Sequence, residues 1–435
     1  MSFMQKSAAA LVLTGAALAV STAYAAGFQL TEQSSLGLGR AYAGAGIVGD
    51  DLSAVHYNPA GMTLLEGTRV QAGFTWIALN ADIDGVNGQS ENGRLKGQAI
   101  PTGYVTHQVN DNLWLGFAMS VPYGMGTEYD KNWWGANRGT NAKIYTFDMN
   151  PNIAWKVNDL ISVGAGVSVQ YAKADLGMGV MPGVQGEIDA DSWDWGFNLG
   201  LMISPTDTLR FGLAYRSSIE HNAEGDFDLS INNQQVLPMP LGLTFPSQAT
   251  VKTPDTVMLT GTWEATPDLR LSGLIRWANW SNFDTLTIKN NASGLAGLLP
   301  ALKPVLGDKF QMVSGMMQQL GKYDIPNKWQ DTWLFSVGAD YRINDAFTVR
   351  GGIAYETSPI DDQTTRMAVI PDTDRLWLSL GATYHFNKQL QFDMGATYLM
   401  GVGDMDLYDG VNGKKIGEYQ SLDAYLVGFQ AQYRF

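Results

Sequence analysis

The sequence predicts an all-β protein, a 14-stranded antiparallel transmembrane β-barrel with an N-terminal plug (hatch) of short helices in its lumen. Three observations lead to this prediction. Apolar and polar residues alternate over segments of about 10 residues or more, Trp and Tyr collect near the ends of those segments, and short connectors alternate with long ones. The composition is that of a folded chain, with 45% hydrophobic and 11% aromatic residues.

Residues 1–25 have the pattern of a signal peptide. Lys6 supplies the positive n-region, AAALVLTGAALAV is the apolar h-region, and Ala23-Tyr24-Ala25 is a small-x-small cleavage site. We expect cleavage after Ala25 rather than an uncleaved anchor, because the apolar run is short for a membrane span. No later segment has about 18 consecutive apolar residues, so the exported chain is periplasmic, secreted or an outer-membrane β-barrel.

The alternation is clearest in DLRLSGLIRWANW. Leu271, Ile275 and Trp277 fall on one face, whereas Arg270 and Arg276 fall on the other. A soluble sandwich would alternate in the same way, so the decision rests on the other two observations. Segments of this length suit a tilted membrane crossing, and most soluble strands are about half as long. Aromatic residues at the segment ends match an interfacial girdle; they include Trp193, Trp195, Trp277, Trp280, Tyr398 and Tyr433.

Connector lengths give the strand count. The short turns lie at 109–112, 156–159, 204–207, 265–268, 343–346 and 386–389. The long connectors lie at about 81–96, 123–141, 175–187, 222–248, 285–328, 359–373 and 402–418. The segments between them number fourteen, and short turns alternating with long external loops are typical of outer-membrane barrels.

The chain therefore divides into three parts after this count. Residues 1–25 are the signal peptide, 26–66 the hatch, and 67–435 the barrel with its long external loops. The segment 26–66 does not alternate and is rich in small residues, which favours a plug over a solvated tail. Loop 285–328 contains apolar residues at helical spacing and predicts short amphipathic helices at the outer surface.

Several functions are disfavoured by composition. The net charge of -14 argues against a nucleic-acid partner, because phosphates require a basic surface. The chain has no cysteine, and its four histidines show no metal-ligand spacing. We find no GxSxG motif and no phosphate loop. The sequence thus predicts no enzyme, no catalytic residue, no cofactor and no metal.

Three ordered stretches resemble the FadL-type family of outer-membrane transporters for long-chain fatty acids and related hydrophobic compounds. They are AGFQLTEQSSLGLGRAYAGAG followed by NPA, then VPYGMGTEY, then TSPIDDQTTRMAVIPDTDRLWLSLGATYHFN. Together they extend over essentially the whole mature chain. The resemblance implies a fourteen-stranded barrel closed by a hatch. It also implies passive diffusion, with capture by outer loops, a lumenal pocket and sideways release beside a kinked third strand.

The resemblance assigns roles to two motifs. Asn58, Pro59 and Ala60 match the hatch motif, whose asparagine is thought to hold the kink of the third strand; the alternative is an ordinary Asx-Pro turn. Pro122 and Gly124 lie near the outer end of that strand, where a proline interrupts the ladder. Gly116 is a further candidate for the kink, and the alternative is that the strand simply ends at Val121.

A fatty acid needs an apolar slot and a cation for its carboxylate. The resemblance implies that Phe28 lines the pocket and that Lys173 supplies a base on the fifth strand. The candidates for the ligand pocket are Phe28, Lys173, Lys322, Lys328 and Arg350, with the lumen-facing Arg210, Arg216, Arg270, Arg276 and Arg342 as further basic residues. For most of these arginines the alternative, an ion pair with a lumenal carboxylate such as Glu356, Asp340 or Asp393, is favoured. The candidates for an external capture groove are Trp133, Trp134, Leu298, Leu299, Met316 and Met317, for which packing between loops is the alternative.

The prediction is passive uptake of long-chain fatty acids across the outer membrane of a diderm (Gram-negative) bacterium. We expect a monomer that contacts a hydrophobic small molecule, outer-membrane lipid and lipopolysaccharide. The alternatives are uptake of aromatic or alkane hydrocarbons by the same route, a general porin, or an adhesin.

Overall fold

The computed structural model describes residues 27–93, 97–233, 240–291, 303–304, 307, 310–311, 314, 321–409 and 412–435. The expected signal peptide, residues 1–25, lies outside the described residues. Among the described helices, none combines the length and the apolar character needed to cross a membrane.

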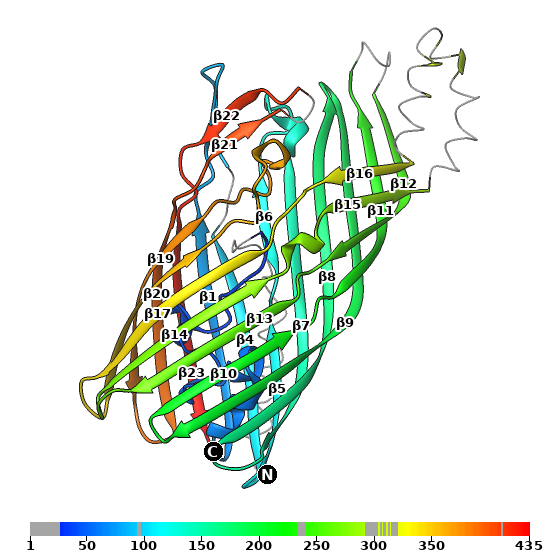
Figure 1. Cartoon of the computed structure of the whole chain (residues 1–435). Helices are drawn as coiled ribbons and strands as arrows, with labels where there is room; N and C mark the ends of the chain where they lie inside the picture. Colours follow the sequence, from blue (N-terminus) through cyan, green and yellow to red (C-terminus); the bar gives the residue numbers. More distant parts are fainter. Residues whose placement is uncertain are drawn as a thin grey trace.

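Fourteen antiparallel strands form a closed barrel (Figure 1). The third strand is broken into β5 and β6. The strands in order are β1 (Thr68–Leu79), β4 (Gln98–Asn110), β5 (Leu113–Ser120) with β6 (Gly124–Glu128), β7 (Asn141–Lys156), β8 (Ile161–Met181), β9 (Val184–Thr206), β10 (Leu209–Arg216), β13 (Thr256–Glu264), β14 (Leu269–Ala278), β17 (Thr332–Arg342), β18 (Phe347–Glu356), β19 (Arg375–His385), β20 (Leu390–Gly401) and β23 (Ala424–Arg434). β1 pairs with β23 from Arg69↔Arg434 to Leu79↔Ala424, so the sheet has no free edge strand at the closure. The predicted fold class is confirmed.

The outer face of the barrel is apolar, as the alternation predicts. Leu271 and Ile275 are exposed, whereas Ser272 and Arg276 on the same strand are buried. The aromatic residues also point outward: Trp195 is 71% exposed and Phe435 62%. An exposed apolar surface of this extent requires a lipid environment.

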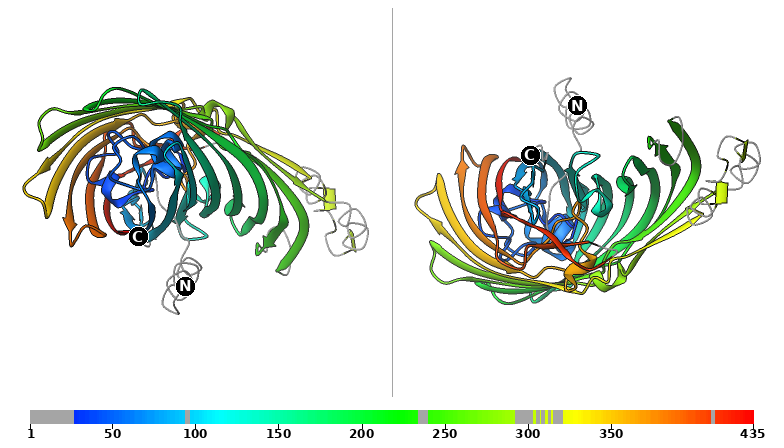
Figure 2. Two further views of the ribbon diagram at one scale, coloured as in Figure 1. Left: turned by 90° about the horizontal axis from the view of Figure 1, so that it is seen from below. Right: turned by 90° about the horizontal axis from the view of Figure 1, so that it is seen from above.

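Some predicted loops are strands instead. β8 and β9 continue through most of connector 175–187, and connector 222–248 forms β11 (Glu220–Ile231) and β12 (Leu241–Lys252). The remaining short strands are β2 (Ile83–Gly85), β3 (Ser90–Glu91), β15 (Thr285–Asn290), β16 (Lys322–Pro326), β21 (Asp406–Tyr408) and β22 (Lys415–Tyr419), and the loop 3-10 helices are η2 (Ala136–Arg138), η3 (Trp280–Asn282) and η5 (Gln363–Thr365). β11, β12, β15 and β16 extend the sheet to one side of the barrel at its long-loop end (Figure 2).

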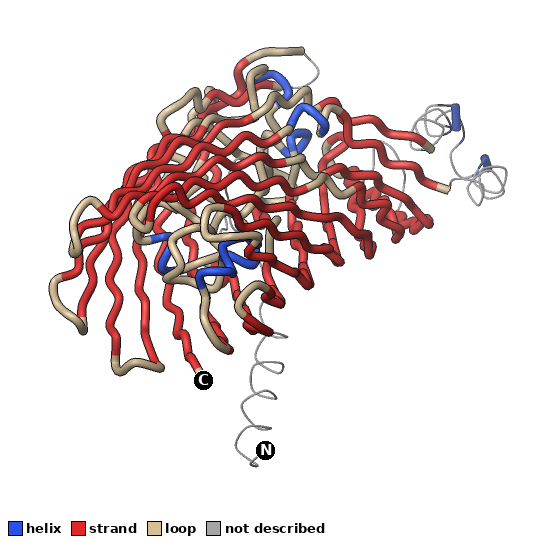
Figure 3. The backbone as a smooth tube through the Cα atoms, turned by 60° about the horizontal axis from the view of Figure 1, so that its bottom comes forward, coloured by secondary structure: helices blue, strands red, loops and turns tan. Residues whose placement is uncertain are grey.

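The N-terminal segment lies inside the barrel (Figures 2 and 3). Its helical pieces are short: α2 (Ser35–Leu38), α3 (Ala54–Tyr57) and the 3-10 helix η1 (Pro59–Leu64). Ser34 caps α2 by accepting a hydrogen bond from the Gly37 N–H. We call residues 27–65 the hatch.

Wall glycines explain how the hatch fits so closely. A Cβ on Gly352 of β18 would meet the backbone of Arg40, and one on Gly395 of β20 would meet the Ser35 carbonyl. Gly338, Gly381 and Gly428 on neighbouring strands are approached by hatch atoms in the same way. Part of the high glycine content, 49 residues, thus makes room for backbone contact between hatch and wall.

A buried ion network fastens the hatch at the short-turn end. Arg40 of the hatch pairs with Asp50, at 2.8 Å, and with Asp340 of β17. Arg350 of β18 donates to Asp340 at 2.9 Å, and Arg270 of β14 reaches Asp50 at 3.0 Å. Removing one member of such a buried network leaves an uncompensated charge, at a cost of about 3–5 kcal/mol.

Candidate functional site

The third strand leaves its neighbour near the long-loop end of the wall. β5 pairs with β4 only as far as Gly103↔Met119, and it ends at Ser120. Beyond that point β6 pairs with β7, while residues 99–102 of β4 pair with β1. Among the described strands, no ladder joins β4 to β6. The hydrogen-bonded wall is therefore broken between them.

The N-terminal segment runs along the broken strand from inside. Gln29 and Tyr123 form an isolated antiparallel bridge. The Leu30 N–H donates to the Pro122 carbonyl at 2.8 Å, and the Gly124 N–H donates to the Phe28 carbonyl at 2.8 Å. The inner edge of the third strand is thus paired with the hatch rather than with β4.

Gln33 of the hatch completes this pairing. Its Nε2 donates to the Val121 carbonyl at 2.7 Å, and its Oε1 accepts from the Val121 N–H at 3.3 Å. A side-chain amide that donates and accepts at once replaces the missing strand partner. The Tyr104 hydroxyl of β4 donates to the Gln33 carbonyl at 2.7 Å, which ties the residue to the other side of the break.

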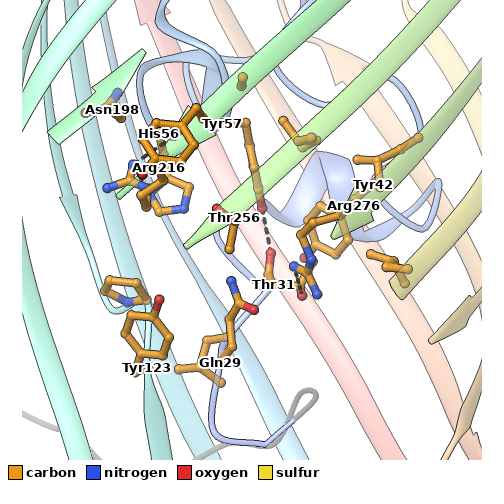
Figure 4. A pocket seen from close by; sticks show the side chains of 17 residues that line it. Gln29, Thr31, Tyr42, His56, Tyr57, Tyr123, Asn198, Arg216, Thr256 and Arg276 are labelled. Carbon is orange, nitrogen blue, oxygen red and sulfur yellow. Dashed lines mark hydrogen bonds between the residues drawn. The ribbon is translucent and has the colours of Figure 1, made fainter. Parts of the chain in front are cut away.

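A pocket adjoins the break. Pro122 and Tyr123 form one side of it, and the hatch and the opposite wall form the rest. Figure 4 shows the two arginines at opposite ends, Arg216 beside His56 and Arg276 beside Thr31. The other lining residues are Gln29, Leu30, Tyr42, Tyr57, Asn198, Ala214, Tyr215, Thr256, Met258, Leu274 and Leu334.

The free volume of the pocket is about 50 Å³. Ligand pockets for drug-sized molecules usually measure about 300–1,000 Å³. The pocket in this closed arrangement has room for a head group or one or two waters, and a long acyl chain requires displacement of lining side chains. The N-terminal segment 29–31 lines the pocket and is joined to the third strand by the Gln29–Tyr123 bridge.

Both arginines of the pocket have carboxylate neighbours, as the ion-pair alternative predicts. Arg276 donates to Glu356 Oε1 at 2.7 Å and to Thr31 Oγ1 at 2.8 Å. Arg216 lies 3.5 Å from Asp148 Oδ2, which is too long for a close charge-assisted hydrogen bond. Arg276 therefore has a close carboxylate partner that compensates its charge, while Arg216 is only loosely paired with a carboxylate.

Phe28 lies in an aromatic cluster above this pocket. Its ring centroid is 4.8 Å from that of Trp280, 5.5 Å from Phe283 and 6.0 Å from both Tyr123 and Trp329. The preceding Gly27 N–H donates to Asp372 Oδ2 at 2.8 Å. Phe28 thus anchors the N-terminal segment against loops, and its ring borders the break through Tyr123.

The NPA motif lies against a different part of the wall than expected. Asn58 Nδ2 donates to the Leu201 carbonyl of β9 at 3.1 Å, and Oδ1 accepts from the Ala60 N–H at 3.1 Å. A Cβ on Gly164 of β8 would lie 2.6 Å from the Pro59 carbonyl carbon and the Ala60 nitrogen. One hydrogen bond ties Asn58 to the sixth strand, and close packing at Gly164 places the motif against the fifth. Among the described residues Asn58 forms no hydrogen bond with the third strand, so the expected direct hold is wrong; Gln33 makes that contact.

Gly116 does not lie at the break. It pairs regularly with Thr106 of β4 and Asn152 of β7. A Cβ at Gly116 would collide with the side chain of Met62 and come within 3.2 Å of Val55, both in the hatch. Its part in the kink is therefore a wrong expectation, and close approach of the hatch is the reason for glycine there. Pro122 and Gly124, by contrast, lie at the break.

Of the predicted basic residues, Arg216 and Arg276 line the pocket, whereas Lys173, Lys322, Lys328 and Arg350 do not. Lys173 shares a strand face with the exposed Val167 and Val169, so it points out of the barrel, where it pairs with Asp189 at 2.9 Å. The alternation of side chains along the strand explains the outward direction of Lys173, which the presence of a basic residue in the sequence does not by itself reveal. Lys322, the first residue of β16, pairs with Asp324, and Lys328 lies 3.9 Å from Asp362; both lysines are exposed, whereas Arg350 is buried in the hatch network.

The loop residues behave mainly as packing groups. Trp133 is 6% exposed, packs against Tyr129 with the ring centroids 5.0 Å apart, and donates from Nε1 to the Gly139 carbonyl. Trp134 packs 4.9 Å from Trp133. Leu298, Leu299, Met316 and Met317 lie outside the described residues. A capture groove at these positions stays a prediction.

Glu32 of the hatch is an unusual buried carboxyl. It is fully buried, and neither oxygen has a hydrogen-bond partner among the described residues. Burial raises its pKa to about 8, with a further contribution from Glu356 and an opposing one from Arg375. The pKa of His56 is shifted in the opposite direction. Burial and the neighbouring Arg216 lower it, which keeps the imidazole neutral.

Two positions of the site were not identified as such from the sequence. Gln33 and His56 are an ordinary glutamine and a lone histidine in a small-residue-rich segment, and no spacing marks them. The signal in the sequence was the interruption of the strand at Pro122. A break there leaves backbone N–H and C=O groups without a neighbouring strand, so another part of the chain must pair with them.

The chain is similar to known outer-membrane transport proteins. Residues 16–435 match the family model described as outer membrane protein transport protein (OMPP1/FadL/TodX). The chain is 30% identical to the long-chain fatty acid transport protein of Salmonella typhi over 429 residues, which are 90% of this chain and 92% of that one. It is 28% identical to outer membrane protein P1 of Haemophilus influenzae over 450 residues, 92% and 91% of the two chains.

Solved structures share the fold. A Pseudomonas aeruginosa FadL homologue superposes with a TM-score of 0.78 at 24% identity, covering 94% of this chain and 100% of that one. The P. putida toluene transporter TodX superposes with a TM-score of 0.74 at 15% identity, covering 93% and 99%.

Proposed function

The chain belongs to the OMPP1/FadL/TodX family of outer-membrane transport proteins for hydrophobic compounds, and from this premise we propose that it carries long-chain fatty acids passively across the outer membrane. The observation that carries the proposal is the pocket between hatch and wall, which opens beside the break in the third strand. An apolar lining with arginines at its ends suits a long chain that terminates in a carboxylate.

The proposed route has three steps. External loops, including Trp133 and Trp134, collect the ligand; it then enters the pocket and leaves sideways between β4 and β6. A lateral exit suits a ligand that is poorly soluble in water. Burial of each methylene stabilises the bound ligand by about 0.8 kcal/mol, and this free energy would be lost if the chain were released into an aqueous lumen. The hatch, fastened by the ion network of Arg40, blocks the direct path along the barrel axis.

We also propose that the protein is a monomer surrounded by outer-membrane lipid and lipopolysaccharide. The supporting observation is that exposed apolar residues occur on strands all around the barrel, from Phe74 of β1 to Val337 of β17 and Phe429 of β23. A continuous apolar belt needs lipid contact on every side.

The test is uptake of labelled oleate by outer-membrane-transporter-deficient cells that express this chain, beside cells with an empty vector and cells given labelled toluene. We expect oleate uptake well above the vector level. An assembled barrel that admits toluene but not oleate would replace fatty acids by hydrocarbons, and large stepwise ion currents in a planar bilayer would support a general porin instead.

A further inference from the structure

One end of the pocket gathers polar groups while its middle is apolar. His56 and Arg216 lie together at this end, with Asn198 beyond them (Figure 4). Leu30, Met258 and other apolar side chains line the rest. Such a division suits an amphipathic ligand whose head group enters one end.

Most polar groups around the pocket are already engaged. Asn198 Nδ2 donates to Asn152 Oδ1 at 2.9 Å, and its Oδ1 accepts from Asn150 at 2.9 Å. The Tyr57 hydroxyl donates to the Thr31 carbonyl at 2.5 Å. The charge of Arg276 is compensated by Glu356 Oε1 at 2.7 Å. These residues therefore have little capacity for a ligand.

The positive charge of Arg216 is only loosely compensated, so this arginine can bind an anionic group. Nη1 donates to Ser168 Oγ at 2.8 Å, and Nη2 donates to the His56 carbonyl at 2.9 Å. Both acceptors are neutral, a hydroxyl oxygen and a backbone carbonyl, so they do not compensate the charge of the guanidinium. Asp148 lies 3.5 Å away and itself accepts from Ser168 at 3.2 Å, so it does not form the bidentate pair that would saturate the arginine.

His56 offers a second donor. The Arg216 Nη2, which can only donate, lies 3.4 Å from His56 Nδ1, so Nδ1 is the acceptor nitrogen. In a neutral imidazole the proton then lies on Nε2. Nε2 has no hydrogen-bond partner within the described part of the chain, and His56 lines the pocket.

We propose that Arg216 and His56 Nε2 form a carboxylate-binding site that makes the pocket select ionised long-chain acids over neutral molecules of the same length. The inference rests on the proposed function and assigns its head-group site. Arg216 supplies the charge, His56 a neutral donor beside it, and the apolar middle of the pocket receives the first part of the chain. Because His56 belongs to the hatch and Arg216 to β10, the head group contacts both parts.

The experiment measures the dissociation constants of oleate and oleyl alcohol for the full chain in lipid nanodiscs, by isothermal titration calorimetry. The two ligands share a chain and differ in the head group. The variants are Arg216→Gln, Arg216→Gln combined with Asp148→Asn, and His56→Phe. The double variant leaves no unpaired buried carboxylate. Arg342→Gln is a matched control, because Arg342, one of the basic candidates from the sequence, does not line the pocket: it is 50% exposed and pairs with Asp268 in the turn region.

We expect the wild type to prefer oleate. Both Arg216 variants should weaken oleate binding on the order of tenfold or more and change oleyl alcohol binding less than about twofold, since a charged hydrogen bond is lost and the chain contacts remain. His56→Phe should reduce the preference by a smaller factor, and Arg342→Gln should behave as wild type.

Two results would overturn the site. Unchanged affinities for both ligands in the double variant would exclude Arg216 from head-group recognition, and an equal loss of affinity for both ligands would make its role structural. Failure of the wild type to bind or import oleate is a different outcome, because it overturns the proposed function together with the site.

Discussion

Gln33 is the residue on which the break in the wall depends most directly. Its amide satisfies both backbone groups of Val121, which a regular third strand would pair with β4. Asn58, the residue that the motif drew attention to, bonds to Leu201 of β9 instead. A sequence motif can identify the hatch, but it cannot tell which wall strand each of its side chains will reach.

Gln33→Met keeps the length of the side chain and removes its hydrogen bonds. Leaving the Val121 groups unpaired costs about 1–3 kcal/mol, so the region around residues 119–125 should open more often. Amide hydrogen exchange of this segment should accelerate in Gln33→Met and stay at the wild-type rate in Asn58→Ala and in the exposed control Gln248→Met. Equal acceleration in Asn58→Ala would show that the motif, and not Gln33, holds the kink.

Glu32 gives a pH prediction at the same scale. The folded-state pKa of about 8 exceeds the ordinary 4.5, so the folded protein binds more protons than the unfolded chain between these values. Stability is therefore lost as the pH rises through this window, and Glu32→Gln should remove that loss. Scanning calorimetry should find the variant increasingly more stable than wild type from pH 4.5 to about 8. A difference that does not change with pH would contradict the buried, protonated state of Glu32.

Among the elements, the hatch and the wall are joined through glycines. η1 lies on Gly164 of β8 and Gly200 of β9. A Cβ at Gly164 would collide with backbone atoms of Pro59 and Ala60, and a Cβ at Gly200 would collide with the side chains of Asn58 and Pro59. At Gly164 the contact is with backbone, so the hatch cannot yield there by a rotamer change. Glycine placement thus determines where the hatch is seated.

Gly164→Ala should loosen the hatch without unfolding the barrel. The added Cβ would lie 2.6 Å from backbone atoms of Pro59 and Ala60, and overpacking of this kind costs about 1–3 kcal/mol. Limited proteolysis should cleave residues 27–65 faster in this variant. Gly261→Ala is the control, because its Cβ would meet nothing closer than 3.6 Å. Equal cleavage rates in both variants would contradict the role of Gly164 in seating the hatch.

The strands of the barrel were predictable and their extensions were not. Alternation is enforced where one face meets lipid, as along Leu271 and Ile275, and there the prediction holds. β11 also alternates, but its outward residues are Glu224, Asp226 and Asp228, which resemble a loop composition. Above the membrane the outward face meets water, so a strand there loses the apolar signal.

The whole molecule combines a closed wall, one local break and a hatch that covers the break from inside. The pocket draws its lining from the hatch and from several strands distant in sequence, which is why the sequence could name Arg216 and Arg276 as candidates but could not rank them. The ranking follows from distances: 2.7 Å from Arg276 to Glu356 against 3.5 Å from Arg216 to Asp148.

The central claim is that ligand leaves through the break, past the N-terminal segment. The most direct measurement uses a reversible lock, Gln29→Cys with Tyr123→Cys, in a chain that has no cysteine of its own. The two positions form a bridge whose hydrogen bonds flank the pair, a geometry with Cα atoms about 4.5 Å apart that suits a disulfide. Oleate uptake should be low in the oxidised variant and return to the wild-type rate on reduction, with each single-cysteine variant insensitive to oxidant. Equal uptake by the oxidised and reduced forms would show that the ligand takes another path.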